Sequence, residues 1–278
     1  MSAKVISIYN LKGGTGKTTL TLALGYFSPA VRQNLRILLI DLDQQANLTA
    51  SALPSNVFQE MFESKRTVAR LFDEKVTFDP HELVYHTFLE TTDIVPSALE
   101  LASREFEAFR LIDGKLRIKL FVDQLKDEYD LIVIDTPPAW NVFSWNALYA
   151  SDYLIMPTAP NFWSIEGTRV VMELLEPLLT SPNYNLQLLG FVVNFVDKRY
   201  KAHKSYIEYL QHTYGSSILG VLGKRTLYEN LSLIKDHLEI FKLLNDAAAK
   251  DLFKVLENIF TLIFDEDKSK QQKGVLNR

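Results

Sequence analysis

Seven consecutive residues near the start of the chain have the types and the spacing of a loop that binds phosphate groups. Glycines let backbone N–H groups curl around an anion, a lysine reaches the β- and γ-phosphates, and a threonine offers its hydroxyl to Mg²⁺. In this chain these would be Lys17 and Thr18, at the start of a predicted helix whose positive dipole end also faces the phosphates. The loop expected to bind a nucleotide comprises Gly13, Gly14, Thr15, Gly16, Lys17, Thr18 and Thr19.

Three acidic residues stand where apolar runs end, and each could serve a magnesium–nucleotide site. Asp135 closes one run and is expected to hold the magnesium shell together with Thr18. Asp41 and Asp43 are two residues apart, so both carboxylates can lie on one face of a strand end, where they repel each other unless a cation intervenes. We expect Asp43 to orient the attacking water and Asp41 to support the metal shell. The alternative is that these acids are solvated loop residues, helix caps or turn formers.

The elements that must position these residues alternate between apolar strands and helical patterns. Strands are predicted at residues 5–9, 36–43, 131–138, 153–160, 188–195 and 217–222, and helices at 17–27, 164–179, 204–214 and 235–264. Such alternation predicts an α/β fold, a single P-loop domain with a twisted, mostly parallel sheet and helices on both faces. Ligands bind at the carboxyl ends of such strands, where the loop and the three acids fall. We expect this domain over residues 1–264 and a polar, mobile tail over residues 265–278.

The composition excludes several classes of function. The 278 residues carry 30 basic and 34 acidic side chains, a net charge of -4, so nucleic-acid binding would have to come from local patches. The chain has no cysteine, which excludes disulfides, iron–sulfur ligation and thiol catalysis. No apolar run approaches the ~18 residues of a membrane span. A soluble, cytoplasmic protein is expected.

Three motifs in this order resemble the deviant Walker A ATPases, and within them the ParA group, which partitions plasmids, chromosomes and other cargo. They are the Lys-Gly-Gly-x-Gly-Lys-Thr-Thr loop at 12–19, Asp-x-Asp-x-Gln-x-Asn at 41–47, and Asp-Thr-Pro-Pro at 135–138 with Asn-Ala-Leu at 146–148. The resemblance covers residues 4 to about 262. It implies ATP and Mg²⁺ as cofactors, an ATP-dependent homodimer, and sequence-independent DNA binding at the nucleoid. It also implies slow ATP hydrolysis that a ParB-like partner protein stimulates.

The resemblance also assigns roles within the site. A lysine at the position of Lys12 reaches across the dimer interface to the phosphates of the partner's ATP, so Lys12, Lys17 and Asp43 form the implied catalytic set. Asn194 matches a position that commonly faces the adenine. The stretch from Asn194 to Asp197 also has the Asn-x-x-Asp spacing of a guanine reader, but Phe195 replaces the usual lysine, so ATP is expected rather than GTP.

Two basic stretches, at residues 197–204 and 223–225, could bind DNA phosphates without reading bases. The resemblance implies that arginines of these regions touch DNA, and Arg199 and Arg225 match best. The alternative is a charged helix face that is merely solvated. The candidate DNA-binding residues are Lys198, Arg199, Lys201, Lys204, Lys224 and Arg225.

The chain also departs from the family pattern. Gln44 replaces a proline, Asn34 stands where a glycine commonly precedes the second strand, and Trp140 and Trp145 enlarge the segment after Asp-Thr-Pro-Pro. The stretch 221–225 replaces a strand that usually ends Ile-Pro. These changes leave the identity of the partner and some details of DNA contact open.

Other functions are possible on the same scaffold. A MinD-like membrane ATPase would need a basic amphipathic helix at the C-terminus, whereas the apolar stretch 252–264 precedes a polar tail and is expected to pack on the sheet. A nitrogenase-type reductase needs cysteines, and a bacterial tyrosine kinase usually ends in a tyrosine cluster. A positioning ATPase for a membrane or protein compartment, or a small-molecule ligase, remains an alternative.

Overall fold

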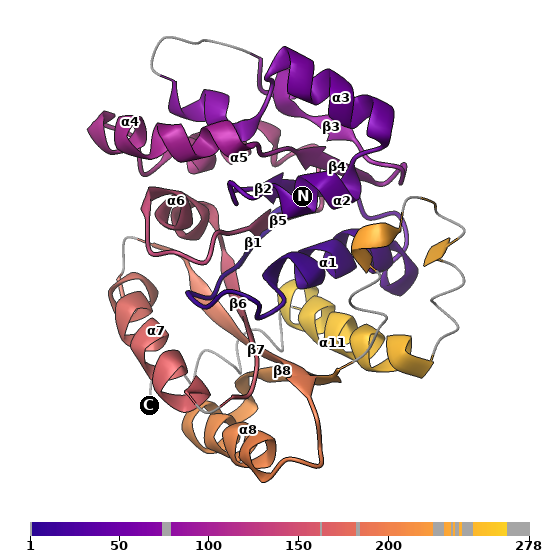
Figure 1. The fold of residues 1–278 in the computed structure, drawn as a ribbon, viewed down its shortest axis with the longest axis vertical. Helices are drawn as coiled ribbons and strands as arrows, with labels where there is room; N and C mark the ends of the chain where they lie inside the picture. The colour runs from indigo at the N-terminus through magenta and orange to yellow at the C-terminus, as the bar shows by residue number, and fades with distance from the viewer. Residues whose placement is uncertain are drawn as a thin grey trace.

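A computed structural model describes residues 2–73, 79–161, 163–181, 184–224, 231–234, 236, 239–240 and 247–265. Within these residues, eight strands form one sheet in the order β3-β4-β2-β5-β1-β6-β7-β8 (Figure 1). All neighbours are parallel except β3, which runs antiparallel to β4 at the edge. The strands are β1 Lys4–Ile8, β2 Ile37–Asp41, β3 Tyr85–His86, β4 Thr92–Val95, β5 Leu131–Asp135, β6 Tyr153–Thr158, β7 Gln187–Val196 and β8 Ile218–Gly223.

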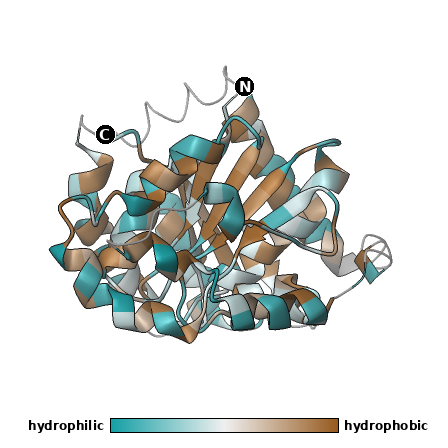
Figure 2. Cartoon of the chain, turned by 90° about the horizontal axis from the view of Figure 1, so that it is seen from above, coloured by the Kyte–Doolittle hydropathy of each residue, from teal (hydrophilic) through white to brown (hydrophobic). Residues whose placement is uncertain are grey.

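Helices cover both faces of the sheet, because alternate residues of each strand point to opposite sides. Ile6 packs with the apolar residues of α1 and α11, whereas its neighbour Val5 packs with those of α5 and α6. The strands form the hydrophobic centre of the molecule, and the helices surround them (Figure 2). The helices are α1 Lys17–Val31, α2 Asn47–Ala52, α3 Ser55–Ser64, α4 Glu105–Arg110, α5 Arg117–Leu125, α6 Val142–Ala150, α7 Ser164–Leu179, α8 Lys201–Tyr214 and α11 Ala247–Phe264.

The predicted fold class is confirmed, and two helix boundaries differ from those predicted. The first helix was expected over residues 17–27, ending before Pro29, which is wrong, since α1 continues to Val31. Proline has no N–H, so it leaves the carbonyl of Gly25 without its helical partner, and the hydroxyl of Thr92 donates to that carbonyl over 3.0 Å. α8 begins three residues before the predicted start at Lys204. The last helix is described as α11 from 247, because much of 235–246 lies outside the described residues.

α11 packs against the sheet, as the sequence predicted. Its apolar face joins the core shared with α1, and Leu252, Leu256 and Ile259 are almost completely buried. In the part of the chain that the structure describes, no helix has the length and apolarity needed to cross a bilayer. Most of the predicted tail, residues 266–278, lies outside the described residues.

Asn34 occupies the turn between α1 and β2, where the sequence suggested that a glycine is more usual. Its φ of 62° lies in the left-handed region, which asparagine tolerates better than other residues with a side chain. The replacement of glycine is therefore compatible with this turn.

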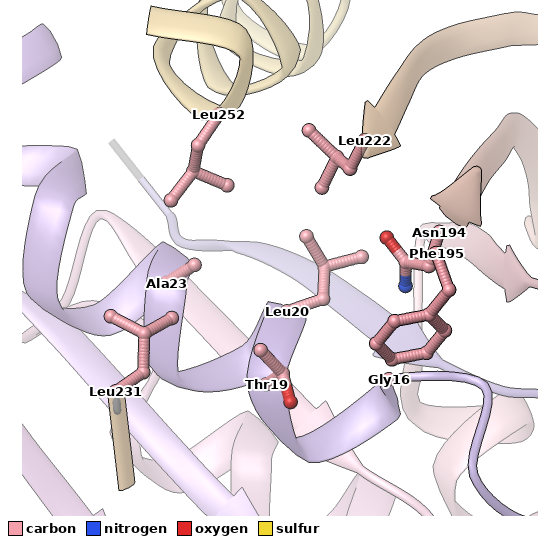
Figure 3. Close-up of a pocket in the computed structure, with 9 residues that line it drawn as sticks. All are labelled: Gly16, Thr19, Leu20, Ala23, Asn194, Phe195, Leu222, Leu231 and Leu252. Carbon is pink, nitrogen blue, oxygen red and sulfur yellow. The ribbon is translucent and has the colours of Figure 1, made fainter. Parts of the chain in front are cut away.

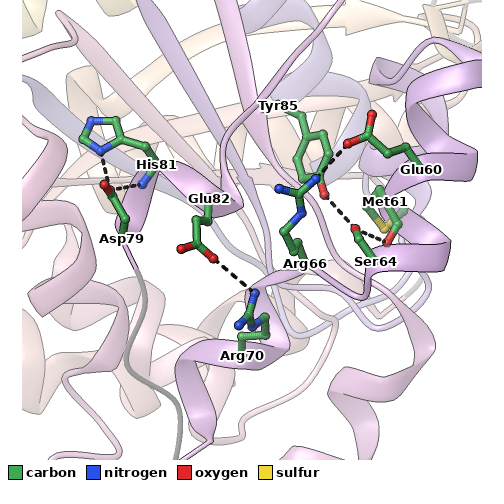
Figure 4. A network of polar contacts seen from close by, with 9 residues as sticks. All are labelled: Glu60, Met61, Ser64, Arg66, Arg70, Asp79, His81, Glu82 and Tyr85. Carbon is green, nitrogen blue, oxygen red and sulfur yellow. Dashed lines mark hydrogen bonds and ion pairs between the residues drawn. The ribbon is translucent and has the colours of Figure 1, made fainter.

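Polar contacts fasten the outer edge of the sheet, beside β3 and α3 (Figure 4). Arg66 pairs with Glu60 at 2.7 Å and Arg70 with Glu82 at 3.6 Å. These ion pairs at the surface each contribute about 0–1 kcal/mol to the free energy of unfolding. They therefore add little to the stability of the fold.

Candidate nucleotide site

The loop between β1 and α1 has the shape that phosphate binding requires. Gly14 and Gly16 have φ values of 70° and 91°, in the left-handed region that favours glycine. A Cβ on Gly16 would come within 2.5 Å of Nδ2 of Asn194. Asn10 closes the base of the loop, because its Nδ2 donates to the carbonyl of Pro157 over 2.8 Å and its Oδ1 accepts the N–H of Lys12 at 3.0 Å. The loop is thus formed and held by contacts within the chain.

The two lysines of the loop have opposite environments. Lys17 is buried, and its Nζ donates to the backbone carbonyl of Lys12 over 3.2 Å. Burial lowers the pKa of Lys17, and the nearby carboxylates of Asp135 and Asp43 act in the opposite direction. Lys12 is exposed to solvent at the rim of the loop. Lys17 is therefore placed to meet a phosphate inside the loop, and Lys12 to meet a group outside it.

A hydroxyl and a buried carboxylate, the groups predicted to bind magnesium, lie side by side at the start of α1. The hydroxyl of Thr18 donates to Oδ2 of Asp135 over 2.7 Å, and Asp135 is completely buried. Its other oxygen, Oδ1, has no hydrogen-bond partner among the described residues. Burial and the neighbouring Asp41 raise the pKa of Asp135 above its ordinary value. A buried carboxylate oxygen without a donor, beside a hydroxyl, fits a hard cation such as Mg²⁺.

Asp41 lies opposite Asp135 in the register of β2 and β5, but its carboxylate is already bonded. Its Oδ2 accepts the N–H and the hydroxyl of Thr49 at 2.9 and 2.7 Å, and its Oδ1 accepts the N–H of Asp43 at 3.0 Å. Burial raises the pKa of Asp41 to about 6, although these bonds lower it. Asp43 accepts the N–H of Gln45 at 2.9 Å and lies at the same end of the sheet. Asp41 thus fixes the turn that carries Asp43.

Asn194 and Phe195 lie on the other side of the loop. Nδ2 of Asn194 donates to the carbonyl of Thr15 over 2.7 Å, and Phe195 has a φ of 58°, which is unusual for an aromatic residue. Figure 3 shows both side chains directed toward Gly16, at the mouth of an apolar pocket beside α1. The pocket is also lined by Thr19, Leu20, Ala23, Leu222, Leu231 and Leu252. Apart from Thr19, which belongs to the predicted loop, the sequence did not predict these lining residues, because the segments that supply them are far apart in the chain.

A second hollow, of about 330 Å³, lies on the outer side of the loop. Lys12 and Thr15 line it from the loop, and Trp163, Glu166 and Thr168 line it from the start of α7. Apolar side chains remain exposed around it, including Trp163 at 70%. The exposed lysine of the loop therefore borders a concave, partly apolar surface.

The predicted basic residues do not all present free charges. Arg199 is paired with Asp197 at 2.6 Å, and this pairing lowers the pKa of Asp197 to about 2. Lys204 lies 3.8 Å from Glu208. Lys198, Lys201 and Lys224 are exposed, and Arg225 lies outside the described residues.

Comparisons with known proteins agree with this geometry. A family described as an AAA domain matches residues 3–188. The chain is 30% identical to the virulence plasmid ParA family protein pGP5-D of Chlamydia psittaci, over 97% of this chain and 99% of that protein. It is also 30% identical to the sporulation initiation inhibitor protein Soj of Bacillus subtilis, over 70% and 74% of the two chains.

Solved structures show the same relationship. A putative plasmid partition protein of Borrelia burgdorferi bound to AMPPNP superposes with a TM-score of 0.76 at 27% identity, covering 95% of this chain and 100% of that one. The McdA structure from Cyanothece, at 22% identity over 92% and 99% of the chains, shares the fold with a TM-score of 0.77. A nucleotide loop on a mostly parallel sheet defines a P-loop NTPase. The chain belongs to the ParA family of partition-type P-loop ATPases.

Proposed function

We propose that the chain is a partition ATPase that binds MgATP, closes into a homodimer through Lys12, and then holds DNA without sequence preference. Slow hydrolysis, stimulated by a ParB-like partner protein, reopens the dimer. The observation that carries this proposal is the contrast within one loop: Lys17 is buried in the phosphate cradle, and Lys12 is exposed beside a hollow. In such a cycle, the rate of hydrolysis would set how long the dimer stays bound to DNA.

The residues of one chain would divide the nucleotide chemistry among them. The N–H groups of the loop and Lys17 would bind the phosphates, and Thr18 and Asp135 would hold a magnesium ion, which would supply positive charge to neutralise them. Asp43 would orient the attacking water. Asp41 would support the metal shell indirectly, because its carboxylate fixes the turn that carries Asp43. Asn194 braces the loop and faces the base.

Dimerisation would depend on the γ-phosphate. Two facing nucleotide sites bring several negative charges together, and Lys12 from the opposite subunit reduces their repulsion. The hollow beside Lys12, with Trp163 exposed at its edge, supplies apolar surface that a second copy can cover. A ligand bound only by the dimer stabilises that dimer by mass action.

DNA binding would come from the basic residues before and in α8, together with the loop after β8. If each subunit neutralises about four phosphates, the log–log dependence of affinity on salt has a slope of roughly −7 per dimer. A dimer carries twice as many basic side chains as one subunit and therefore binds DNA more tightly by avidity. Because the proposed dimer forms only with ATP, DNA binding would depend on ATP. The basic residues in this proposal are Lys198, Arg199, Lys201, Lys204, Lys224 and Arg225.

A gel-shift experiment tests this function. Random-sequence duplex DNA is titrated with the full chain in the presence of ATP with Mg²⁺, ADP with Mg²⁺, or no nucleotide, and GTP is tested as a competitor. We expect a shift with ATP alone, abolished by high salt, and little competition by GTP. DNA binding that is equal in the three conditions contradicts the proposal, and so does binding to vesicles in place of DNA.

A further inference from the structure

An exposed aromatic ring lies within the basic stretch that precedes α8. Tyr200 comes directly before Lys201, the first residue of α8, and 59% of its surface is exposed. Its backbone is fixed, because its carbonyl accepts the N–H of His203 at 3.1 Å and that of Lys204 at 3.4 Å. The ring is therefore open to a ligand at a defined position of the fold.

The ring of Tyr200 rests on a second ring, which is itself held in place. The ring centroids of Tyr200 and His203 are 5.3 Å apart, with an angle of 39° between the ring planes. Nδ1 of His203 accepts the backbone N–H of Asp197 at 3.0 Å, so the imidazole joins α8 to the loop before it. A side chain that is already ordered loses less conformational entropy when a ligand binds to it. Tyr200 is in this sense prepared for a contact through its ring.

The charges around the ring are mostly positive. The segment 197–208 carries four basic and two acidic side chains, leaving histidine aside. Both acids already have basic partners: Asp197 pairs with Arg199 at 2.6 Å, and Glu208 lies 3.8 Å from Lys204. Lys198 and Lys201 are exposed, and neither forms an ion pair within 4.0 Å in the part of the chain that the structure describes. Two free cations therefore flank the ring.

An aromatic ring between cations fits a nucleic-acid strand whose bases are unpaired. Lysines bind the phosphates of single strands and of duplexes alike, because both carry a charged backbone. A ring adds to this affinity only where it can stack on the face of a base. In a duplex these faces are covered by the neighbouring base pairs, whereas an unpaired base leaves its face open. Tyr200 should therefore contribute to the binding of single strands and not to that of duplexes.

We propose that Tyr200 stacks on an unpaired base of a single-stranded nucleic acid, while Lys198 and Lys201 bind the phosphates beside that base. The inference rests on the proposed function, in which the same basic stretch binds DNA. It adds a second class of ligand, because charge alone does not distinguish paired from unpaired bases. The stacking is indifferent to sequence, since every base has an aromatic face.

Fluorescence anisotropy with labelled oligothymidine and with a duplex of the same length tests the stacking. The full chain is used with a non-hydrolysable ATP analogue and Mg²⁺. Tyr200→Ala should bind oligothymidine about tenfold more weakly than wild type and should bind the duplex equally well. Tyr200→Phe keeps the ring and should match wild type on both. Tyr184→Ala removes a tyrosine that is 38% exposed outside the basic stretch, and should change neither affinity. Unfolding temperature and nucleotide binding show whether each variant is folded.

Two further measurements separate stacking from charge. Stacking releases no counterions, so Tyr200→Ala should lower the affinity for oligothymidine by the same factor at every salt concentration and leave the log–log slope unchanged. Lys201→Ala should instead reduce the slope by about 0.7 for each phosphate contact that is lost. A 2-aminopurine base placed within the oligothymidine loses fluorescence when it stacks. This quenching should occur with wild type and Tyr200→Phe and should be absent with Tyr200→Ala.

The outcomes distinguish the stacking from the proposed function. Tyr200→Ala that binds oligothymidine like wild type, or that loses affinity equally for single strand and duplex, overturns the stacking and leaves duplex binding standing. A wild-type chain that binds neither nucleic acid overturns the proposed DNA binding as well. Oligouridine of the same length separates the two sources of unpaired bases. An equal dependence on Tyr200 with both oligomers supports stacking on either strand, and a dependence with one oligomer names that strand as the ligand.

Discussion

Thr18 and Asp135 are 117 residues apart in the chain, and the hydroxyl of Thr18 donates to Oδ2 of Asp135 over 2.7 Å. The second oxygen of the carboxylate is buried and has no partner in the described residues. This pair joins the start of α1 to the end of β5 and leaves one oxygen ready for a cation.

Asp135→Asn should weaken nucleotide binding and stabilise the ligand-free protein. Binding of ATP should lose its dependence on Mg²⁺ and fall by about tenfold or more, because an amide is a poor magnesium ligand. Burial raises the pKa of Asp135, so at neutral pH folding must either bury a charge or take up a proton, which destabilises the fold, and this penalty fades as pH falls to the unfolded pKa. Without nucleotide the variant should gain roughly 1 kcal/mol at neutral pH and less near pH 4.

Calorimetry with and without Mg²⁺, and urea unfolding at both pH values, measure these effects. A variant that binds MgATP like wild type would remove Asp135 from the metal site.

Gly16→Ala should destabilise the loop before any nucleotide binds. The left-handed φ and the contact with Asn194 together predict a loss of about 1–3 kcal/mol. Gly13→Ala is the matched control, because a Cβ there meets nothing within 4 Å. Thermal unfolding without nucleotide compares the two variants, and equal losses would contradict this geometry of the loop.

Thr49→Val should affect hydrolysis more than nucleotide binding. It removes one of two bonds to a buried carboxylate oxygen: the hydroxyl bond is lost, and the backbone N–H of residue 49 alone remains on Oδ2 of Asp41. We expect a loss of about 1–3 kcal/mol in urea unfolding and a lower kcat as the turn of Asp43 loosens. Thr21→Val, at a buried threonine whose hydroxyl donates to its own helix, should change the kcat little. An unaltered kcat in Thr49→Val would separate Asp41 from the chemistry.

Asp197→Asn should strengthen DNA binding. The guanidinium of Arg199 is bonded to Asp197, whose pKa is lowered to about 2, so the pair stays charged and neutralised at every working pH. Releasing Arg199 should steepen the salt slope by roughly 1–2 per dimer and raise affinity at low salt. In contrast, Arg199→Ala should weaken the complex, by less than the loss of an unpaired cation would. Filter binding over a salt series measures both, and a weaker complex with Asp197→Asn would refute this role.

Much of the site could be predicted because its residues stand at strand ends. An apolar strand followed by a glycine loop, and acids closing two further strands, place Lys17, Asp43 and Asp135 together once the sheet is parallel. The edge strand and helix limits could not be derived in this way. The continuation of α1 past Pro29 depends on a hydroxyl from Thr92, and local sequence carries no sign of that contact.

The surroundings and partners of individual side chains could not be predicted from the sequence either. Five apolar side chains between residues 106 and 120 would be expected in the core from their type alone, yet the chain turns between α4 and α5 and leaves them exposed. The charge of Arg199 was visible in the sequence, but its bidentate pairing with Asp197 was not. The sequence shows which interactions a side chain is able to make. The neighbours that the fold places around it decide which of these interactions it makes.

The most direct test of the central claim is the mass of the full chain and of Lys12→Ala in light scattering, each with a non-hydrolysable ATP analogue and Mg²⁺. Lys201→Ala, another exposed lysine, is the control. We predict that wild type and the control double in mass, whereas Lys12→Ala stays monomeric at the same concentration and still binds nucleotide within about threefold of wild type. A Lys12→Ala chain that dimerises as well as wild type would contradict the account.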